Sequence, residues 1–511
     1  MYKELWNRNQ KLYLTTFFLG FLCYGFLLFN NVLTGDNWMS VFHPESKNRL
    51  LVQGGRWFQV VIGKAQFGRL FAPTFTSCVF IICLSISSIL LTECVGFKEK
   101  YSKYIFSSIF ITFPFWNETA IFNMIRVPIG VALLLSCAAS FVFIKSPNTS
   151  KWSNLIVTIL LWLSISIYQT YIFFFITALI GYVLIQAQSP EFKFKVLLDI
   201  LKNCLIVIVL TSILYIISFK TSLVVYDLKA ISSGKYSFID TNIDIIKNLK
   251  NTLSRTFSFW ILPQILLPKF IKYIMAFFLV ISLLSQFKDG FSESLKTLLK
   301  VVLLLALILS PWLLGVVKNE AVIYRYNAMT AMALVVSFVV TFTFEFSLLQ
   351  ALKYKFILYG IAGTIVASNL LQNNACHYAL YLSNARDLSI SQELLSRIHS
   401  FDDYDINNIY TLNIYGRPAY RNLERPFDIY QPENLFSGYN VINYGGIWDL
   451  TSSQRWNDSF KLLGEQADYR VKMHHKNKKF SLPNIRKVKA WPNKNALIYD
   501  EDNLTFHLIL Q

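Results

Sequence analysis

Two carboxylates stand where apolar runs of the chain end, and they are its best candidates for acid–base chemistry. Asp36 follows the first apolar run beside Gly35, and Glu118 follows the third. A carboxylate can take the proton of an attacking hydroxyl, and a second one can bind or orient that hydroxyl. Each also has a structural interpretation: an Asx-turn for Asp36 and an acidic residue in a first helical turn for Glu118.

Arginines near the same run ends are candidates for binding phosphate. Arg126 lies nearly two turns into a span predicted over Ala120–Ile144, a depth at which an unpaired guanidinium is costly. Glu118, eight residues earlier, would share its side of that helix, so an ion pair and a phosphate site are both open. Arg325 opens a later span and either snorkels to the membrane interface or clamps a phosphate.

Aromatic and amide side chains accompany these charges. Trp38 and Trp116 suit an aromatic belt at a membrane interface, with stacking against a sugar as the second interpretation. Tyr168 and Gln169 interrupt an apolar stretch, Asn154–Gln186, that is too long for one span. They predict a turn between two spans there, and a contact to a substrate hydroxyl is the alternative.

The elements that must position these residues are membrane spans. The chain has 511 residues, 54% hydrophobic and only 15% charged, and its apolar runs approach the twenty residues that cross a bilayer. We predict a polytopic α-helical protein of about eleven spans, the last over Phe356–Leu371. The net charge of +18 lies largely in short loops, so it indicates orientation and lipid contact rather than nucleic acid.

The loop over 31–70 joins the first two spans and is predicted to lie at the membrane surface. Its second half places Gly54, Gly55, Arg56 and Trp57 before an apolar segment with basic neighbours, a pattern typical of an interfacial helix. Lysine-rich loops alternate with lysine-poor ones, which predicts a cytoplasmic N-terminus and places the Asp36 loop outside.

The segment over 372–511 has a different composition and is predicted to be a small α/β domain on the outer side. Strands are expected at Asn408–Ile414, Ala496–Asp500 and Leu504–Ile509, and a helix at Ser389–Ser400. The sequence has no Walker loop, dinucleotide fingerprint or nucleophile elbow in a suitable context. No metal site is predicted, because His474 and His475 stand among lysines that suit a solvated face.

Taken in order, several short motifs carry a family resemblance over most of 1–371. They are Gly35-Asp36-Asn37-Trp38, Gly55-Arg56-Trp57, Phe113-Pro114-Phe115-Trp116-Asn117-Glu118, Ile167-Tyr168-Gln169 and Arg325. The chain resembles the GT-C class of membrane glycosyltransferases, and more narrowly the phage-borne serotype-converting glucosyltransferases (Gtr type) that modify bacterial O-antigen. Many GT-C enzymes carry two neighbouring acids in the first outer loop, whereas Asp36 has no adjacent acid.

The resemblance implies an inverting transfer of glucose from undecaprenyl-phosphate glucose to an O-antigen hydroxyl at the periplasmic face of the bacterial inner membrane. Asp36 would act as base, and Arg126, Arg325 and Arg56 would stabilise the leaving phosphate. No cofactor is expected, because the donor is lipid-linked. The alternatives are a transporter or flippase of a lipid-linked sugar, which needs no base, and an O-antigen polymerase.

Overall fold

The computed structural model describes residues 2–30, 41, 43–65, 72–97, 99–146, 151–189, 191–230, 244–261, 267, 269–287, 294–313, 316, 330–346, 355–415, 460–474 and 493–509. The chain divides into two compact units between His377 and Tyr378. That boundary falls inside a single helix, α18 (Lys355–His399). The roles predicted for 1–371, a catalytic membrane domain, and for 372–511, a periplasmic domain, stay predictions.

The first unit is helical. Its other helices are α1 (Tyr2–Tyr24), α2 (Phe26–Phe29), α4 (Pro44–Gln53), α5 (Trp57–Ala65), α6 (Pro73–Val95), α7 (Lys100–Thr112), α8 (Trp116–Ala120), α9 (Arg126–Lys145), α10 (Lys151–Ile167), α11 (Tyr171–Gln186), α12 (Phe194–Val225), α13 (Ile245–Ile261), α14 (Lys269–Ser285), α15 (Ser294–Leu309) with the 3-10 turn η2 (Ser310–Trp312), and α17 (Ala331–Phe346).

Long apolar helices indicate a multi-pass membrane protein, as predicted. Among the described residues, four segments are long and apolar enough to cross a bilayer: Pro73–Val95, Arg126–Lys145, Phe194–Val225 and Leu295–Trp312. Shorter apolar helices accompany them at Lys151–Ile167, Tyr171–Gln186, Phe270–Ser285 and Ala331–Glu345. Only 17% of the apolar window of α12 is buried inside the protein. An apolar helix with so little buried surface is typical of one that faces lipid.

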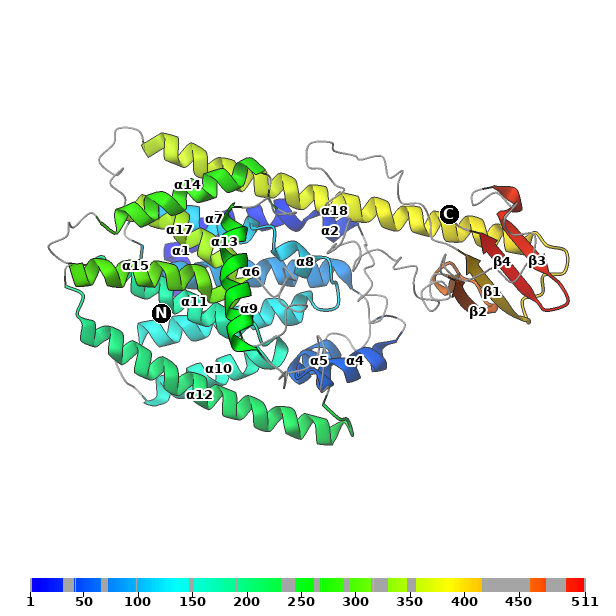
Figure 1. Cartoon of the computed structure of the whole chain (residues 1–511), viewed down its shortest axis with the longest axis horizontal. Helices are drawn as coiled ribbons and strands as arrows, with labels where there is room; N and C mark the ends of the chain where they lie inside the picture. Colours follow the sequence, from blue (N-terminus) through cyan, green and yellow to red (C-terminus); the bar gives the residue numbers. More distant parts are fainter. Residues whose placement is uncertain are drawn as a thin grey trace. The chain divides into compact units, whose positions relative to one another are not determined.

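The helices pack into a bundle whose centre contains α6 and α9. Helix α9 packs against both α6 and α10, and α7 packs against α17. Figure 1 shows most helices of this unit running along one direction, while α13 crosses them steeply and contacts α14 and α15. Helix α6 begins with Pro73 in its first turn and ends at Gly96, whose φ of 71° is the left-handed conformation that terminates helices.

Three predicted boundaries differ from the structure. The first helix begins at Tyr2, before the expected Leu12–Asn30 span, and it is interrupted by Gly25. Where one interfacial helix was expected, the structure has two helices, α4 and α5, separated by a turn at Gly54 and Gly55. The last predicted span does not stop at Leu371, because α18 continues as one helix to His399.

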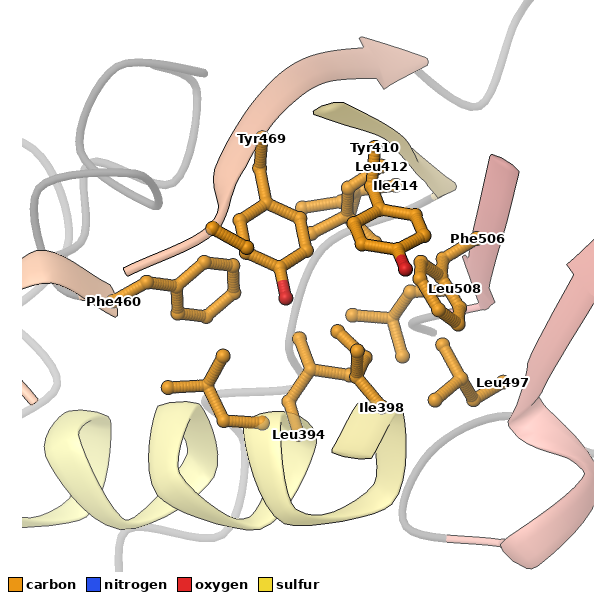
Figure 2. Packing of buried hydrophobic residues seen from close by; sticks show 12 residues of the cluster. Leu394, Ile398, Tyr410, Leu412, Ile414, Phe460, Tyr469, Leu497, Phe506 and Leu508 are labelled. Atoms are coloured by element: carbon orange, nitrogen blue, oxygen red, sulfur yellow. The ribbon is translucent and has the colours of Figure 1, made fainter. Parts of the chain in front are cut away.

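The second unit is a four-stranded mixed sheet packed against the end of α18. Its strands β1 (Ile409–Tyr415), β2 (Asp468–His474), β3 (Leu497–Asp500) and β4 (Thr505–Ile509) have the order β2-β1-β4-β3. Strand β1 is parallel to β2 and β4, and β3 is antiparallel to β4. Figure 2 shows Leu394 and Ile398 of α18 pointing toward sheet residues such as Tyr410 and Phe506. The small α/β fold and three predicted strands are confirmed; β2 was not predicted.

Candidate active site

The turn between α4 and α5 is held by two side chains that are distant from it in the sequence, Gln169 and Tyr215. Gln169, just before α11, donates hydrogen bonds from Nε2 to the Gly54 carbonyl at 2.7 Å and to the Tyr215 hydroxyl at 2.9 Å. The Tyr215 hydroxyl, on α12, donates in turn to the Gly55 carbonyl at 3.0 Å. Gly55 has a φ of 77°, and a Cβ there would lie 2.0 Å from that hydroxyl. Only glycine therefore fits this closely packed turn.

This turn places Arg56 and Trp57 against the following helices. The Arg56 guanidinium carbon lies 4.3 Å from the centre of the Tyr168 ring, a cation–π contact. The Trp57 ring lies 5.9 Å from that of Trp162, whose indole nitrogen donates to the Ser218 hydroxyl at 3.0 Å. Stacking on a ring face leaves the N–H groups at the guanidinium edge available to an anion. Two motifs that are far apart in the sequence, one at Arg56 and one at Tyr168, thus meet.

Arg126 is the first residue of α9, and it is only 1% exposed. Its Nε donates to the carbonyl of Ala120, and its Nη1 donates to the Ser77 hydroxyl and, at 3.3 Å, to the carbonyl of Pro73. The expectation that Arg126 lies two turns into one helix with Glu118 is wrong, because the chain leaves the helical path between α8 and α9. All three acceptors are uncharged, and the ion pair with Glu118, one of the two alternatives for Arg126, is not among the contacts of Arg126 with described residues.

The segment before α9 contains the short helix α8. Glu118 lies in its first turn and is buried. Trp116 is fully buried, and its ring packs edge-on against Phe80 and Phe110 with centroids 6.5 and 5.5 Å apart. Its indole nitrogen donates to the Phe110 carbonyl at 2.8 Å. These contacts favour a packing role for Trp116 over stacking against a sugar.

A helix from beyond the predicted spans joins this group. Asn373 of α18 donates to the Thr112 carbonyl at 2.9 Å and to the Cys23 sulfur at 3.2 Å. Its side-chain oxygen accepts a 2.9 Å hydrogen bond from Asn117 of α8. The side-chain nitrogen of Asn369, one turn earlier, donates to the Thr112 hydroxyl oxygen at 3.4 Å. The sequence prediction did not include Asn373, because it ended the last span at Leu371. The four-residue spacing from Asn369 to Asn373 could have indicated that the helix continues.

A row of aromatic rings connects the Arg56 turn with α8. Tyr168 contacts Tyr171 at 6.3 Å between ring centroids, and Tyr171 contacts Phe174 at 6.0 Å. Phe174 lies 6.0 Å from Phe110, whose ring packs on Trp116. Six of the nine predicted site residues are therefore in one connected region: Arg56, Trp116, Glu118, Arg126, Tyr168 and Gln169.

The other three predicted site residues, Asp36, Trp38 and Arg325, lie outside the described residues. Their roles stay predictions. Within the described ranges, no group of three or more His, Cys, Asp or Glu side chains is placed to hold a metal ion.

A second polar cluster belongs to the C-terminal unit. The buried Glu465 carboxylate accepts hydrogen bonds from the Ala467 amide at 2.8 Å and the Tyr404 hydroxyl at 2.9 Å, and it pairs with His399 Nε2 at 2.5 Å. Burial raises the pKa of Glu465, but these three hydrogen bonds outweigh it, so the net pKa is lowered. Burial, together with the neighbouring carboxylate, raises the pKa of Tyr404 to about 12. The cluster ties the end of α18 to the segment before β2.

The described helices, several of them long and apolar enough to cross a bilayer, pack around a buried arginine and a set of amide side chains, which is the architecture of a membrane protein with a polar interior. The model of the Glucosyl transferase GtrII family matches residues 25–344, more than half of the chain, and the protein belongs to this family. It is thus an enzyme that moves a glucosyl residue from a sugar donor to an acceptor, as the resemblance implied. No curated protein and no solved structure gives a significant match to the chain.

Proposed function

We propose that the enzyme transfers a glucosyl residue, with inversion, from undecaprenyl-phosphate glucose to a hydroxyl of an O-antigen repeat. The reaction takes place at the periplasmic face of the bacterial inner membrane. Membership of the glucosyltransferase family supports the glucosyl group, and the apolar helices support a donor that stays in the bilayer. In this proposal the fold is GT-C-like with about eleven spans, a cytoplasmic N-terminus and a periplasmic C-terminal domain.

The main support for a donor with a phosphate group comes from the hydrogen bonds of Arg126. A buried guanidinium usually pairs with a carboxylate, because an isolated buried charge is costly. Here Nε and Nη1 bond only to neutral oxygens, and Nη2 makes no hydrogen bond to a residue that the structure describes. The positive charge is thus held in place while one nitrogen stays available to an anion. A phosphodiester leaving group is such an anion, and the planar guanidinium suits its oxygens.

The proposed mechanism assigns one group to remove the proton of the acceptor and others to stabilise the negative charge of the leaving phosphate. Asp36 takes the proton of the acceptor hydroxyl as its oxygen attacks the anomeric carbon of glucose. The bond between that carbon and the phosphate oxygen breaks, and the polyprenyl phosphate leaves with the electron pair. Arg126, Arg56 and Arg325 stabilise the negative charge on this leaving group. Glu118 binds a sugar hydroxyl or assists the base, and Tyr168 and Gln169 line the approach to Arg56.

The decisive experiment is the change Asp36→Asn in bacteria that make undecaprenyl-phosphate glucose and a suitable O-antigen. Loss of the base should lower glucosylation about 10²- to 10⁴-fold, while membrane levels of the protein stay normal. Nuclear magnetic resonance of the isolated O-antigen, with and without the protein, identifies the added sugar. Asp227→Asn is the matched control: it makes the same chemical change just after the end of α12, and its φ of 48° is one that asparagine tolerates.

The outcomes separate the candidate functions. A glucose branch that appears with the native chain and disappears with Asp36→Asn supports the proposal. An O-antigen that changes only in chain length indicates a polymerase, and one that gains no sugar indicates a transporter or a different acceptor. Full glucosylation by Asp36→Asn rejects Asp36 as the base.

A further inference from the structure

Helix α13 turns an apolar face outward and a polar face toward the bundle. Four exposed apolar residues follow at intervals of three or four positions and therefore share one face. They are Ile246, Leu249, Leu253 and Phe257, with exposed fractions from 36% to 83%. Asn248, Thr252 and Thr256 share a second face, and all three are buried. A surface helix of a water-soluble protein has the opposite arrangement, with its apolar face toward the core.

A third face of α13 is polar and basic. Lys247, Lys250 and Ser254 are exposed, and each follows one of the exposed apolar residues by one position. One position rotates a side chain by roughly 100° around the helix axis. The buried face is rotated by the same angle in the other direction, since Thr252 and Thr256 each precede an exposed apolar residue. The helix thus presents three adjacent faces, one to the protein, one apolar and one basic.

The buried end of α13 packs where a membrane-spanning segment ends. The Phe259 ring lies 6.2 Å from the ring of Trp312, the last residue of an apolar segment long enough to cross a bilayer. The same ring lies 5.8 Å from that of Phe115, just before α8. Figure 1 shows α13 crossing the other helices of this unit steeply. A helix that crosses the spans steeply, at the end of one of them, lies along the membrane surface.

The charge of α13 matches an anionic lipid surface. Ile245–Ile261 contains two lysines and one arginine and no acidic residue. The acid before it, Asp244, accepts a 3.0 Å hydrogen bond from the backbone amide of Lys247 and so caps the helix. A helix with neighbouring apolar and basic faces lies in the plane of a membrane, with its apolar face among the acyl chains and its cations beside anionic headgroups.

We propose that α13 is an interfacial helix that binds the anionic surface of the bilayer next to α8. Its apolar face enters the acyl region, and Lys247 and Lys250 contact the phosphate groups of anionic membrane lipids. Its buried face packs on the bundle. The inference does not depend on the sugar donor or on the acceptor, so it stands apart from the proposed function.

The first test measures the depth of single spin labels on the full chain in nanodiscs of phosphatidylcholine and phosphatidylglycerol. Cys78 and Cys204, the two cysteines that are not fully buried, are replaced by alanine, and one new cysteine is introduced at a time. A label at Leu253→Cys should lie about 5–10 Å below the headgroup boundary, where oxygen relaxes it more than a water-soluble nickel complex does. Ser254→Cys, the next residue, is the matched control and should show the reverse. Val209→Cys, exposed on the apolar helix α12, provides the reference for the acyl region.

The second test removes the two lysines. Each lysine near an anionic surface contributes roughly a fivefold preference for that surface. Adding phosphatidylglycerol to phosphatidylcholine nanodiscs should therefore raise the ratio of immersed to water-exposed label at Leu253→Cys, by up to roughly 25-fold. The double variant Lys247→Gln/Lys250→Gln should lose this rise. Lys461→Gln changes an exposed lysine of the C-terminal unit in the same way, and it should keep the rise.

Three results would overturn the proposal. If the nickel complex relaxed the labels at Leu253→Cys and Ser254→Cys equally, the apolar face would lie in water. If the label at Leu253→Cys were protected from both reagents, protein would cover this face, for example a second copy of the chain. If the immersed fraction did not change with the phosphatidylglycerol content, anionic lipid would be rejected as the partner of α13.

Discussion

Replacing Gly55 by alanine should disrupt the turn that presents Arg56. Two costs follow from the structure. The residue must keep a φ of 77°, which costs an L-residue about 1–2 kcal/mol. Its Cβ would lie 2.0 Å from the Tyr215 hydroxyl, so that hydroxyl must move. Moving it breaks the hydrogen bonds from Gln169 and to the Gly55 carbonyl, each contributing about 0.5–1.5 kcal/mol. The total is roughly 2–5 kcal/mol.

The assay is a double-mutant cycle on purified protein in detergent, read as thermal midpoint and as glucosyl transfer. Tyr215→Phe removes the oxygen that the new Cβ would meet, so Gly55→Ala should cost only about 1–2 kcal/mol in that background. The expected coupling between the two sites is therefore about 1–3 kcal/mol. Transfer should fall with Gly55→Ala, because Arg56 is carried away from Tyr168.

Gly63→Ala is the control for this cycle. Gly63 lies in α5, and a Cβ there would meet no atom within 4 Å. Alanine should stabilise the helix by up to about 1 kcal/mol through its higher helix propensity. If Gly55→Ala behaved like Gly63→Ala, or if the effects of Gly55→Ala and Tyr215→Phe were additive, the described packing of the turn would be wrong.

Two further perturbations test other parts of the structure. Arg126→Lys keeps the charge, but a lysine cannot reach the three acceptors together. We therefore expect glucosyl transfer to fall at least about tenfold and the free energy of unfolding to fall by about 1–3 kcal/mol. An unchanged kcat/KM would reject phosphate binding by Arg126. The lowered pKa of Glu465 means that its contribution to stability is present above the unfolded value of about 4.3 and is lost as the pH falls through the folded value. Glu465→Gln should lower the thermal midpoint at pH 7 and weaken its decline below pH 5, and a parallel decline in both proteins would contradict this assignment.

Local signals in the sequence were sufficient to predict a helix boundary where polar residues interrupt an apolar run. The split predicted near Tyr168 and Gln169 is confirmed, with α10 ending at Ile167 and α11 beginning at Tyr171. Strand β2 was not predicted, although buried Tyr469 lies between exposed neighbours as in a strand. The lysines in and after β2 had been interpreted as a solvated face.

Tertiary contacts explain the larger differences. The break between α8 and α9 is invisible in hydropathy, because Ile121 and Phe122 continue the apolar pattern through it. The continuation of α18 is hidden for the opposite reason. Asn373 and Asn374 look like the start of a polar tail, yet both bond to α1, which only the folded bundle brings near. Local propensity cannot report such partners.

The helix ends explain why these polar residues are inside the bundle. The last four carbonyls of a helix have no partner within it and need donors from elsewhere. Here donors come from the residues around the candidate site: Trp116 to Phe110, Tyr24 to Ile111, Asn373 to Thr112, Arg126 to Ala120 and Gln169 to Gly54, which follows α4. A donor that satisfies a carbonyl is fixed in place and is not available to a substrate. Trp116 and Asn373 are therefore held in place by their own hydrogen bonds, whereas Nη2 of Arg126 makes no hydrogen bond to a residue that the structure describes.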